Sequence, residues 1–482
     1  MQNDNIYIKY FTVACMLFSL PFIIHGNYYF DDVYRSVYGD GSWHELGRPL
    51  ADVVTFGLSL NSHVLSDFYP LGTIVAVIFL VYIFVLVMNS GFSINKPYAL
   101  FPLPLLFISP VFMQNMSYRY DSTAMIMALA IAIASFYFSF SKGWKTTVTG
   151  ILMLIASLSL YQPCANIFLG LAATNLIVKV KESNNEKIKQ MVLDCAVFSI
   201  SFILYFIFVV KLFSLGGSRA AFINPSQIFE SLSYVFLSTY SIYALLLTGY
   251  IKVAYIALSA LALLSGALYY IKERPSLLAV SSFIVRFILC LTLLFFSIIG
   301  TSFLVVEGIT DIRVMVGMSS VVFFLTVCST RFFPPKITLT TCSIASMLFI
   351  SLSFQYSNAL KSQRSFELSL ISNVAMDVNY GRDGTVFISG TMPTAPVVRT
   401  SIRAMPFIGR IVPPSPPWVS RRLAVAEGIS TAENSWSGDN VDIISTICED
   451  NLRPETSNPL YDVYHLKRGI LVYFKGTGSI CL

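Results

Sequence analysis

Apolar runs of roughly 15 to 25 residues recur along the first three quarters of the chain, near the length that a helix needs to cross about 30 Å of hydrocarbon. Backbone groups in lipid must hydrogen-bond within their own segment, so these runs are expected to be helices. The composition agrees, with 55% hydrophobic and 12% charged residues. We therefore expect an α-helical polytopic membrane protein. The short alternating segments typical of an outer-membrane barrel are not a feature of this sequence.

Basic loops between the apolar runs indicate the orientation of the chain, because the positive-inside rule places such loops in the cytoplasm. Loops of this kind hold Lys96, Lys142, Lys145, the stretch 179–189, Lys272 with Arg274, and Arg331 with Lys336. Counting from a cytoplasmic N-terminus predicts about eleven transmembrane helices, with the C-terminal part outside. The predicted spans are 8–25, 69–88, 98–113, 122–140, 146–160, 164–178, 191–213, 251–271, 280–304, 314–330 and 337–354.

Two apolar segments need separate interpretation. The run 11–24 is not followed by a small-residue cleavage pattern, so we interpret it as a retained span rather than a removed signal peptide. Residues 227–250 are apolar enough to cross, but counting them would place Lys272 and Arg274 outside and the C-terminal part inside. We interpret 227–250 as a re-entrant or interfacial helix. The sequence alone leaves open whether this segment spans the membrane.

The composition changes near residue 355, beyond which charged residues become frequent and no apolar run is long enough to span. We expect a transmembrane domain at 1–355, with a catalytic outer loop at 26–68, and a small α/β domain at 356–482. By the span count, this C-terminal domain is periplasmic. Its predicted elements are an amphipathic helix at 365–378, strands at 385–389 and 469–474, a short helix at 439–450 and a proline-rich connector at 413–417.

The eight cysteines include no CxxC pair and no spacing with histidine that suits zinc. Six of them lie in or beside apolar runs and are expected to be small core residues. Cys448 and Cys481 are the only two in the C-terminal part. In a periplasmic domain these two can form a disulfide, and the sequence does not decide whether they do.

Two adjacent carboxylates follow the first apolar run. Asp31 and Asp32 are preceded by Tyr28-Tyr29-Phe30 and followed by Tyr34-Arg35. One interpretation is that they only cap the next helix at a membrane boundary. The other is catalytic, because in glycosyl transfer a carboxylate commonly takes the proton of the attacking hydroxyl, and aromatic rings can stack on sugars. Repulsion between two neighbouring carboxylates also tends to raise the pKa of one of them, which suits a general base. Of the two, we favour Asp32 slightly over Asp31 as the base.

Isolated arginines occupy the predicted outer intervals, where a guanidinium can bind phosphate oxygens in a bidentate way. They are Arg35, Arg48, Arg119, Arg219 and Arg313. The competing interpretation is that each pairs with a local acid, Arg119 with Asp121 and Arg313 with Glu307 or Asp311. For the group as a whole, phosphate binding is the better hypothesis.

Two further motifs fall on the predicted outer face. They are Tyr118-Arg119-Tyr120-Asp121 and Tyr161-Gln162-Pro163. Tyrosine and glutamine at span ends often serve only as membrane-belt or capping residues. Here they can also hydrogen-bond sugar hydroxyls, so Tyr118, Asp121, Tyr161, Gln162 and Glu307 join the candidate substrate-binding residues.

Several classes of partner are not expected. The net charge of +6 is modest and no basic run is interleaved with aromatics, so nucleic acid is not a predicted partner. No cofactor is predicted. A divalent metal is possible but not expected, because the chain has several outer arginines and no Asp-x-Asp triplet in the candidate loop.

These motifs together resemble a known family. The Tyr-Tyr-x-Asp-Asp-x-x-Arg stretch that starts at Tyr28, Trp43, Gly47-Arg48-Pro49-Leu50, the Tyr118 motif and a Ser-Leu-x-x-Tyr-Gln-Pro segment are similar to the glucosyltransferases of bacterial O-antigen modification. These serotype-converting enzymes are often carried by temperate phages. The likeness covers the membrane region well and the C-terminal part only in its general layout.

The resemblance implies a GT-C-like multi-pass enzyme of the bacterial inner membrane, with acidic residues in its first large outer loop. It implies undecaprenyl-phosphate glucose as lipid donor and a sugar of the lipopolysaccharide O-antigen as acceptor, on the periplasmic side. The acceptor residue and linkage are not encoded in any motif found here.

A lipid-linked sugar flippase without covalent chemistry is the alternative. A transporter is expected to carry charges at mid-span, often with broken helices and two related halves. The candidate charges instead cluster at one membrane face. Acyl transfer to the O-antigen is a further alternative, but the sequence offers no convincing histidine-based site for it within the bundle.

Overall fold

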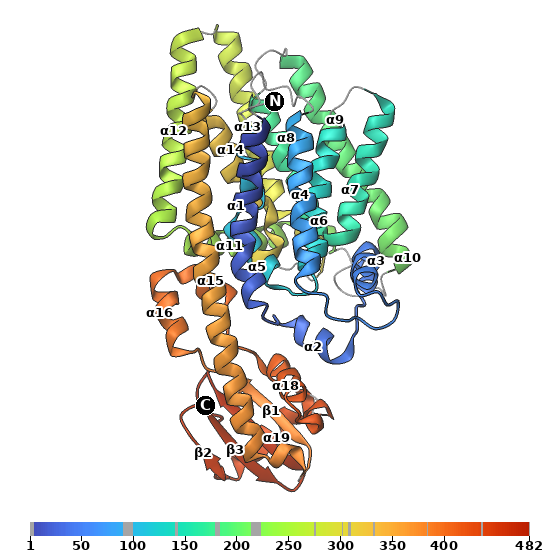
Figure 1. Cartoon of the computed structure of the whole chain (residues 1–482), viewed down its shortest axis with the longest axis vertical. Coiled ribbons are helices and arrows are strands. Elements are labelled where there is room, and N and C mark those ends of the chain that lie inside the picture. The colour runs from blue at the N-terminus through green and yellow to red at the C-terminus, as the bar shows by residue number, and fades with distance from the viewer. Residues whose placement is uncertain are drawn as a thin grey trace.

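The computed structural model describes residues 4–89, 100–139, 143–178, 184–213, 223–273, 276–300, 302–306, 310–330, 333–382, 384–434 and 437–481. A large helical bundle carries a small C-terminal domain at one end, and the N-terminus lies at the opposite end of the bundle (Figure 1). We call the end that carries the domain the domain-proximal end. The candidate residues Arg219 and Glu307 lie outside the described residues.

Eight helices of the described chain are long and apolar enough to cross a membrane. They are α1 (Asp4–His25), α4 (Leu71–Asn89), α6 (Ser122–Ser139), α7 (Trp144–Ala165), α9 (Asn184–Tyr205), α12 (Gly249–Glu273), α13 (Leu277–Ile299) and α15 (Pro335–Asp377). Helix α9 continues through a π-helical turn, η4 (Phe206–Val210), into α10 (Lys211–Phe213). Three shorter apolar helices are α3 (Pro49–Leu58), α8 (Ile167–Val178) and α14 (Ser319–Thr330). The polytopic fold is therefore shown, while the count of eleven spans stays a prediction.

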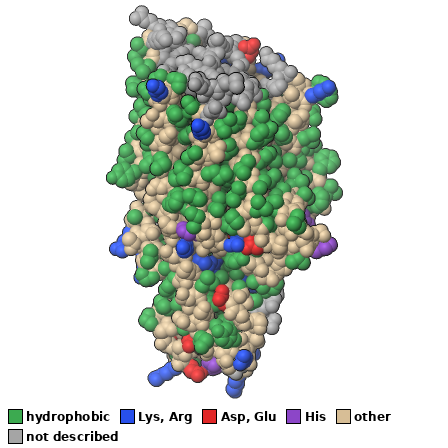
Figure 2. Space-filling view, in the orientation of Figure 1, with side chains coloured by type: hydrophobic (Ala, Val, Ile, Leu, Met, Phe, Trp, Pro, Cys, Tyr) green, Lys and Arg blue, Asp and Glu red, His purple; other side chains and the backbone are tan. Residues whose placement is uncertain are grey.

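The surface of the bundle matches this composition. A broad hydrophobic belt covers it, and charged and histidine side chains gather in a row near the level where the C-terminal domain begins (Figure 2). Further Lys and Arg side chains border the belt near the opposite end (Figure 2). Such a belt, flanked by polar zones, is the pattern of a membrane-embedded surface.

The predicted span at 98–113 is not one continuous helix. Its described part consists of a 3₁₀ turn, η3 (Leu103–Leu106), and a short helix, α5 (Pro110–Ser117). Pro102, Pro104 and Pro110 explain the break, because proline lacks an N–H and restricts the residue before it. The whole segment from Leu103 to Ser117 is buried in protein, where irregular backbone is tolerated at membrane depth.

The ambiguous segment 227–250 forms α11 (Ile228–Leu246) after a short turn, η5 (Pro225–Gln227). It is not among the eight helices that are apolar enough to span. It contacts η6 (Ser302–Leu304) and α17 (Pro406–Ile411), the latter belonging to the C-terminal part of the chain. This arrangement favours an interfacial position at the domain-proximal end.

Helix α15 runs for 43 residues from the bundle into the C-terminal domain without a break (Figure 1). The predicted end of the last span at 354, the boundary at 355 and the separate amphipathic helix at 365–378 all fall within it. Its apolar residues continue at helical spacing past Gln355, so no local signal ends the helix there. The bundle and the C-terminal domain therefore share a helix.

The C-terminal domain is a small α/β unit, as expected. Its sheet has the order β1-β4-β3-β2, with β1 (Val386–Thr391) parallel to β4 (Gly469–Lys475). β3 (Tyr461–Leu466) pairs antiparallel with β4 and with the short β2 (Thr456–Ser457). The helices of the domain are α16 (Pro396–Ala404), α17, α18 (Pro417–Ala426) and α19 (Ser437–Glu449). The strands predicted at 385–389 and 469–474 and the helix at 439–450 are confirmed.

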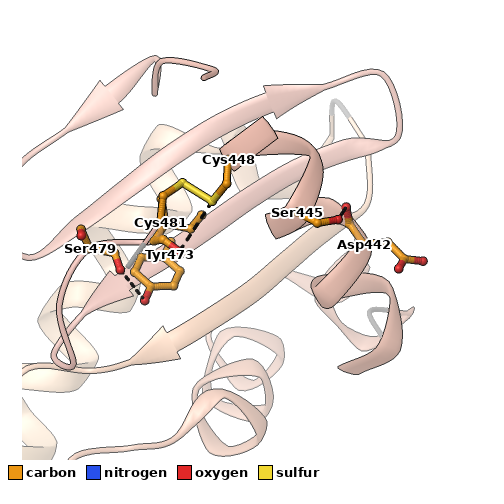
Figure 3. The surroundings of a disulfide bond; sticks show 7 residues. Asp442, Ser445, Cys448, Tyr473, Ser479 and Cys481 are labelled. Carbon is orange, nitrogen blue, oxygen red and sulfur yellow. Dashed lines mark hydrogen bonds between the residues drawn. A yellow bond between two sulfur atoms is a disulfide. The ribbon is translucent and has the colours of Figure 1, made fainter. Parts of the chain in front are cut away.

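A disulfide joins Cys448 at the end of α19 to Cys481, with a Cα–Cα distance of 5.4 Å (Figure 3). Near it the Tyr473 hydroxyl donates to the backbone carbonyl of Ser479 at 3.4 Å. The bond holds the last described residues against the sheet and its helix. The structure therefore contains the Cys448–Cys481 disulfide that the sequence left undecided.

Candidate active site at the domain-proximal end

Asp32 joins the first loop of the bundle to the segment that precedes α6. It lies in the first turn of α2 (Asp31–Tyr38), and its side chain is fully buried. Its carboxylate accepts hydrogen bonds from the backbone N–H groups of Tyr29 at 2.9 Å, Arg119 at 2.8 Å and Tyr120 at 3.2 Å. Both oxygens are therefore occupied, and Asp32 holds two chain segments together.

The surroundings of Asp32 change its protonation. Burial, and after it the charge of Asp121, raise the pKa of Asp32 to about 7, while the backbone N–H donors act in the opposite direction. The group therefore titrates near neutral pH from a fully enclosed position.

Asp31 is placed differently from its neighbour. Its side chain is half-buried and, among the described residues, makes no hydrogen bond or ion pair. Burial acts to lower the pKa of Arg35 and Arg313, but the charges of neighbouring groups, Asp31 among them, raise each pKa above its ordinary value. Burial lowers the pKa of Arg422, and the charge of Asp31 acts against that shift. The charge of Asp31 therefore acts on arginines from three separate segments of the chain.

A buried acid–arginine pair lies beside Trp43. The indole N–H of Trp43 donates to Asp121 Oδ1, and Arg35 Nε lies 3.8 Å from Asp121 Oδ2. The guanidinium carbon of Arg35 is 4.2 Å from the centre of the Trp43 ring. Arg35 Nε and Asp121 Oδ2 are buried without a hydrogen-bond partner in the described structure. Because buried polar atoms are nearly always hydrogen-bonded, these two atoms have capacity for a further polar group.

Arg119 holds two loops together through hydrogen bonds and an ion pair. Its guanidinium binds both oxygens of Asp67, with Nε at 3.1 Å and Nη2 at 2.5 Å, and Nη1 donates to the carbonyl of Gly26. It also lies over the rings of Tyr28 and Tyr69, at 4.7 and 4.8 Å. The pairing of Arg119 with Asp121, which was the competing interpretation from the sequence, is not observed, because Arg119 forms its ion pair with Asp67. With its donors engaged, Arg119 fixes the loop after α1 to the loop before α4.

Arg48 is held by a network from two other helices. Its Nε donates to Gln162 Oε1 at 2.7 Å, and its guanidinium carbon lies 4.7 Å from the centre of the Tyr161 ring. Gln162 Nε2 donates to the hydroxyl of Tyr205, which in turn donates to the carbonyl of Gly47, both at 2.9 Å. A Cβ on Gly47 would lie 2.6 Å from that hydroxyl, and its φ of +74° also favours glycine. The absence of a side chain at Gly47 therefore allows this loop to approach Tyr205.

Tyr161 sits at an interruption of α7. Its backbone (φ −160°, ψ 105°) is not helical, and Pro163 follows two residues later. The buried Tyr161 hydroxyl donates to the backbone carbonyl of Arg313 at 2.9 Å, and Asn115 Nδ2 donates to the same carbonyl at 3.2 Å. The two bonds place the Arg313 segment next to the ring that Arg48 covers.

Arg313 completes a second acid–arginine group. Its Nε lies 3.8 Å from Asp311 Oδ2, and Nη1 donates to the hydroxyl of Tyr118. The buried side chain of Gln114 accepts from the backbone N–H of Arg313 at 2.8 Å and donates to Asp311 at 3.0 Å. Of the two acids named as alternatives for Arg313, Asp311 is a partner. Arg313 thus stands between Tyr118 and Tyr161.

The C-terminal domain contributes to this region. Trp418 of α18 stacks on Phe30 at a centroid distance of 5.9 Å, and Arg422 lies over the rings of Tyr34 and Trp418 at 4.6 and 5.0 Å. Helix α18 therefore packs on α2, beside Asp31. Phe30 has a left-handed φ of 43°, which is strained for an aromatic residue and turns the chain into α2.

The structure therefore brings together most of the residues that the sequence singled out. Ten of the candidates are described, and the loops that hold them converge at the domain-proximal end. The sequence reading missed Gln114, Tyr205, Trp418 and Arg422. Trp418 and Arg422 lie nearly four hundred residues from Asp31, so only their residue types, not their spacing, could have indicated a role. Among the described residues no group of three or more His, Cys, Asp or Glu side chains is arranged to hold a metal.

This combination defines a class: a polytopic membrane protein with an acid–arginine–aromatic site at one end of its bundle, beside a small α/β domain. Residues 20–324 match the family described as glucosyl transferase GtrII, and the chain belongs to this family. It is also 27% identical over 478 residues to an "uncharacterized 55.3 kDa protein in gtrB 5′region" of Salmonella phage P22. That alignment covers 93% of this chain and 98% of the phage protein. No solved structure matches the chain.

The resemblance inferred from the motifs is confirmed by this match. Family membership supports a glycosyltransferase, and specifically glucosyltransferase activity in O-antigen modification. The matched region includes α2 and every arginine of the described site in the bundle.

Proposed function

We propose that this protein transfers a glucosyl group from undecaprenyl-phosphate glucose to a sugar of the lipopolysaccharide O-antigen at the periplasmic face of the inner membrane. One observation carries the proposal: Asp31 is a half-buried carboxylate, without a side-chain partner in the described structure, and its charge acts on arginines of the bundle and of the C-terminal domain. A carboxylate that can take a proton and arginines that can bind a phosphate are the groups that transfer from a lipid phosphate requires.

The geometry favours Asp31 as the base. Asp32 uses both oxygens on backbone N–H groups, so its role is to position the loop and the adjacent carboxylate. In the reaction, Asp31 takes the proton of the acceptor hydroxyl as that oxygen bonds to the anomeric carbon of glucose. The bond from the anomeric carbon to the phosphate oxygen breaks, and its electron pair leaves with the polyprenyl phosphate.

Arg48 and Arg313 are the best candidates for holding that phosphate. Both lie next to Tyr161, and burial, together with the like charge of Arg313, acts to lower the pKa of Arg48. Two guanidinium groups whose charges act to lower each other's pKa are stabilised when an anion binds near both. Within the described residues Arg48 donates a hydrogen bond only through Nε, so its terminal nitrogens can bind a phosphate.

The periplasmic orientation is supported by two features. Lys145, Lys189 and Lys336 lie near the starts of α7, α9 and α15, at the end of the bundle away from the domain. By the positive-inside rule that end is cytoplasmic. The disulfide in the C-terminal domain also fits an oxidising compartment.

The test is a transfer assay in membranes that contain the protein, with radiolabelled undecaprenyl-phosphate glucose and lipopolysaccharide. We expect label in the polysaccharide with wild type, a loss of about 100-fold with Asp31→Asn, and no change with Glu45→Gln, an exposed acid of the same loop. Labelled lipid that only changes leaflet, with no label in polysaccharide, would instead support the flippase.

Orientation is tested separately with an alkaline phosphatase fusion at the C-terminus and a second fusion within 179–189. We expect enzyme activity from the first and none from the second. The reverse result would place the site in the cytoplasm and contradict the proposal.

A further inference from the structure

An aromatic strip lies beside Asp31 and is built from two distant parts of the chain. Tyr34, three residues after Asp31, and Tyr38, seven residues after it, share its face of α2, because residues at these spacings are neighbours on a helix. Their rings are 4.7 Å apart. Phe30 and Trp418 extend the strip, with ring planes inclined by only 26°. We call Phe30, Tyr34, Tyr38 and Trp418 the aromatic platform.

Packing alone does not account for the platform. Trp418 is 41% exposed and Tyr38 is 39% exposed, whereas aromatic rings that serve only the core are enclosed. By contrast, Trp43 in the same outer region is 1% exposed. The platform therefore presents the exposed parts of Trp418 and Tyr38 on the surface, at the junction of α2 and α18.

Arg422 gives the platform a polar centre. Its guanidinium lies over Tyr34 and Trp418, and within the described residues it forms no hydrogen bond or ion pair. Guanidinium N–H groups that point past a ring can donate to hydroxyls of a bound ligand. Exposed rings together with a fixed donor form a surface that suits a sugar, which has an apolar C–H face and a hydroxyl rim.

We propose that the aromatic platform and Arg422 bind the acceptor polysaccharide, so that a sugar residue contacts the exposed part of the Trp418 ring while the reacting hydroxyl of the chain reaches Asp31. This inference rests on the proposed function and deepens it, since it assigns the acceptor side of the site to the C-terminal domain. The arginines at Tyr161 then serve the lipid donor. A carbohydrate chain running along α2 and α18 would have its reacting sugar at the N-terminal end of α2.

The test uses the full-length protein in detergent and delipidated O-polysaccharide, without donor, followed by saturation-transfer NMR. We expect binding to wild type and to Trp418→Phe, and loss of binding with Trp418→Leu, which keeps apolar contact with Phe30 but removes the ring. Arg422→Gln is expected to weaken binding. Matched controls are Trp144→Leu, at a 74% exposed tryptophan on α7, and Arg468→Gln, at an exposed arginine of the β3–β4 turn.

Transfer kinetics supply the second arm. Trp418→Leu should raise the acceptor KM by about tenfold, the order expected for one lost stacking contact, and leave the donor KM unchanged. If Trp418→Leu left acceptor binding and the acceptor KM unchanged, the assignment of the platform to acceptor binding would be overturned, even if wild type transfers glucose. Polysaccharide binding that depends on Trp418, in a protein that transfers no glucose, would instead keep the platform and refute the proposed function. A rise in the KM of both donor and acceptor, together with a lowered melting temperature, would show that Trp418 only packs. That result would also overturn the inference.

Discussion

The guanidinium of Arg364 donates two hydrogen bonds to the backbone carbonyl of Tyr28, from Nη2 at 2.6 Å and from Nε at 3.2 Å. Its Nη1 donates to Glu367 at 3.3 Å, and Glu367 accepts from both the backbone and the side chain of Ser415 at 2.8 Å. All three side chains are buried. The long helix α15 thereby ties the first loop of the bundle to the connector that precedes α18. The candidate base and the C-terminal domain are parts of one packed unit.

Asp31 and Asp32 are predicted to affect different quantities. Asp31→Asn should lower kcat by about 100-fold with little change in the melting temperature, because a general base is lost and no hydrogen bond or ion pair of the described structure is removed. Asp32→Asn should lower activity and also the melting temperature, because an amide cannot accept at both positions where backbone N–H groups point. Transfer assays and thermal denaturation of purified protein measure the two effects. Near-normal turnover in both variants would contradict the assignment of this loop as catalytic.

The pKa of Asp32 leads to a pH dependence of stability. A carboxyl whose pKa rises from an ordinary value near 4 to about 7 on folding stabilises the fold at low pH and loses that contribution as pH rises through 7. Between pH 5 and 8, wild type should therefore lose thermal stability with rising pH more steeply than Asp32→Asn. Thermal melts of both proteins across this pH range test the difference. Parallel curves would show that Asp32 does not titrate there.

Arg48 and Arg313 should not tolerate lysine. Lysine keeps the charge but loses the planar fork that binds a phosphate in a bidentate way, so Arg48→Lys and Arg313→Lys should each lower kcat at least tenfold, about the order seen for loss of a charge-stabilising donor. Arg468→Lys, on the exposed β3–β4 turn, is the control and should transfer normally. Arg119→Lys is expected to lower the melting temperature instead, because the bidentate contact with Asp67 is structural. Full activity of both site variants would exclude bidentate phosphate contact.

Transfer should survive removal of divalent metal ions. A polyprenyl monophosphate leaving group carries less charge than a nucleotide diphosphate, and arginines can supply the positive field that stabilises it. Wild-type membranes treated with EDTA and then washed should retain their rate of glucose transfer. If EDTA abolishes transfer and magnesium or manganese restores it, Asp31 becomes a candidate metal ligand, and the base must be sought at Asp121 or Asp311.

The disulfide should stabilise the C-terminal domain. Closing the 33-residue separation between Cys448 and Cys481 restricts the unfolded chain, with an expected contribution of about 3–4 kcal/mol. Cys448→Ser and Cys481→Ser should make the domain more sensitive to limited proteolysis. Cys195→Ser, at a half-buried cysteine that is not in a disulfide, is the control and should behave as wild type. Equal sensitivity of all three variants and wild type would show that the bond is dispensable.

The sequence by itself determined the membrane class and most of the long helices, and it supplied the hypothesis about the chemistry of the site. Spans such as α4 and α12 are long apolar runs, and no local alternative satisfies their backbone in lipid. The break at Pro104 and Pro110 was missed because hydropathy averages over prolines. The family was also readable, since its motifs lie within single loops, such as the one that holds Asp31 and Arg35.

Only the tertiary structure decided which of the two acids is held by backbone hydrogen bonds. Asp31 and Asp32 are equivalent in sequence, and they differ because Asp32 points at the N–H groups of Arg119 and Tyr120, which come from another segment. The pairing of Arg119 with Asp67 rather than Asp121, and the placement of Trp418 on Phe30, likewise depend on contacts between residues far apart in the chain. Such contacts leave no local pattern, because their energy comes from packing of whole helices and not from the spacing of the residues themselves.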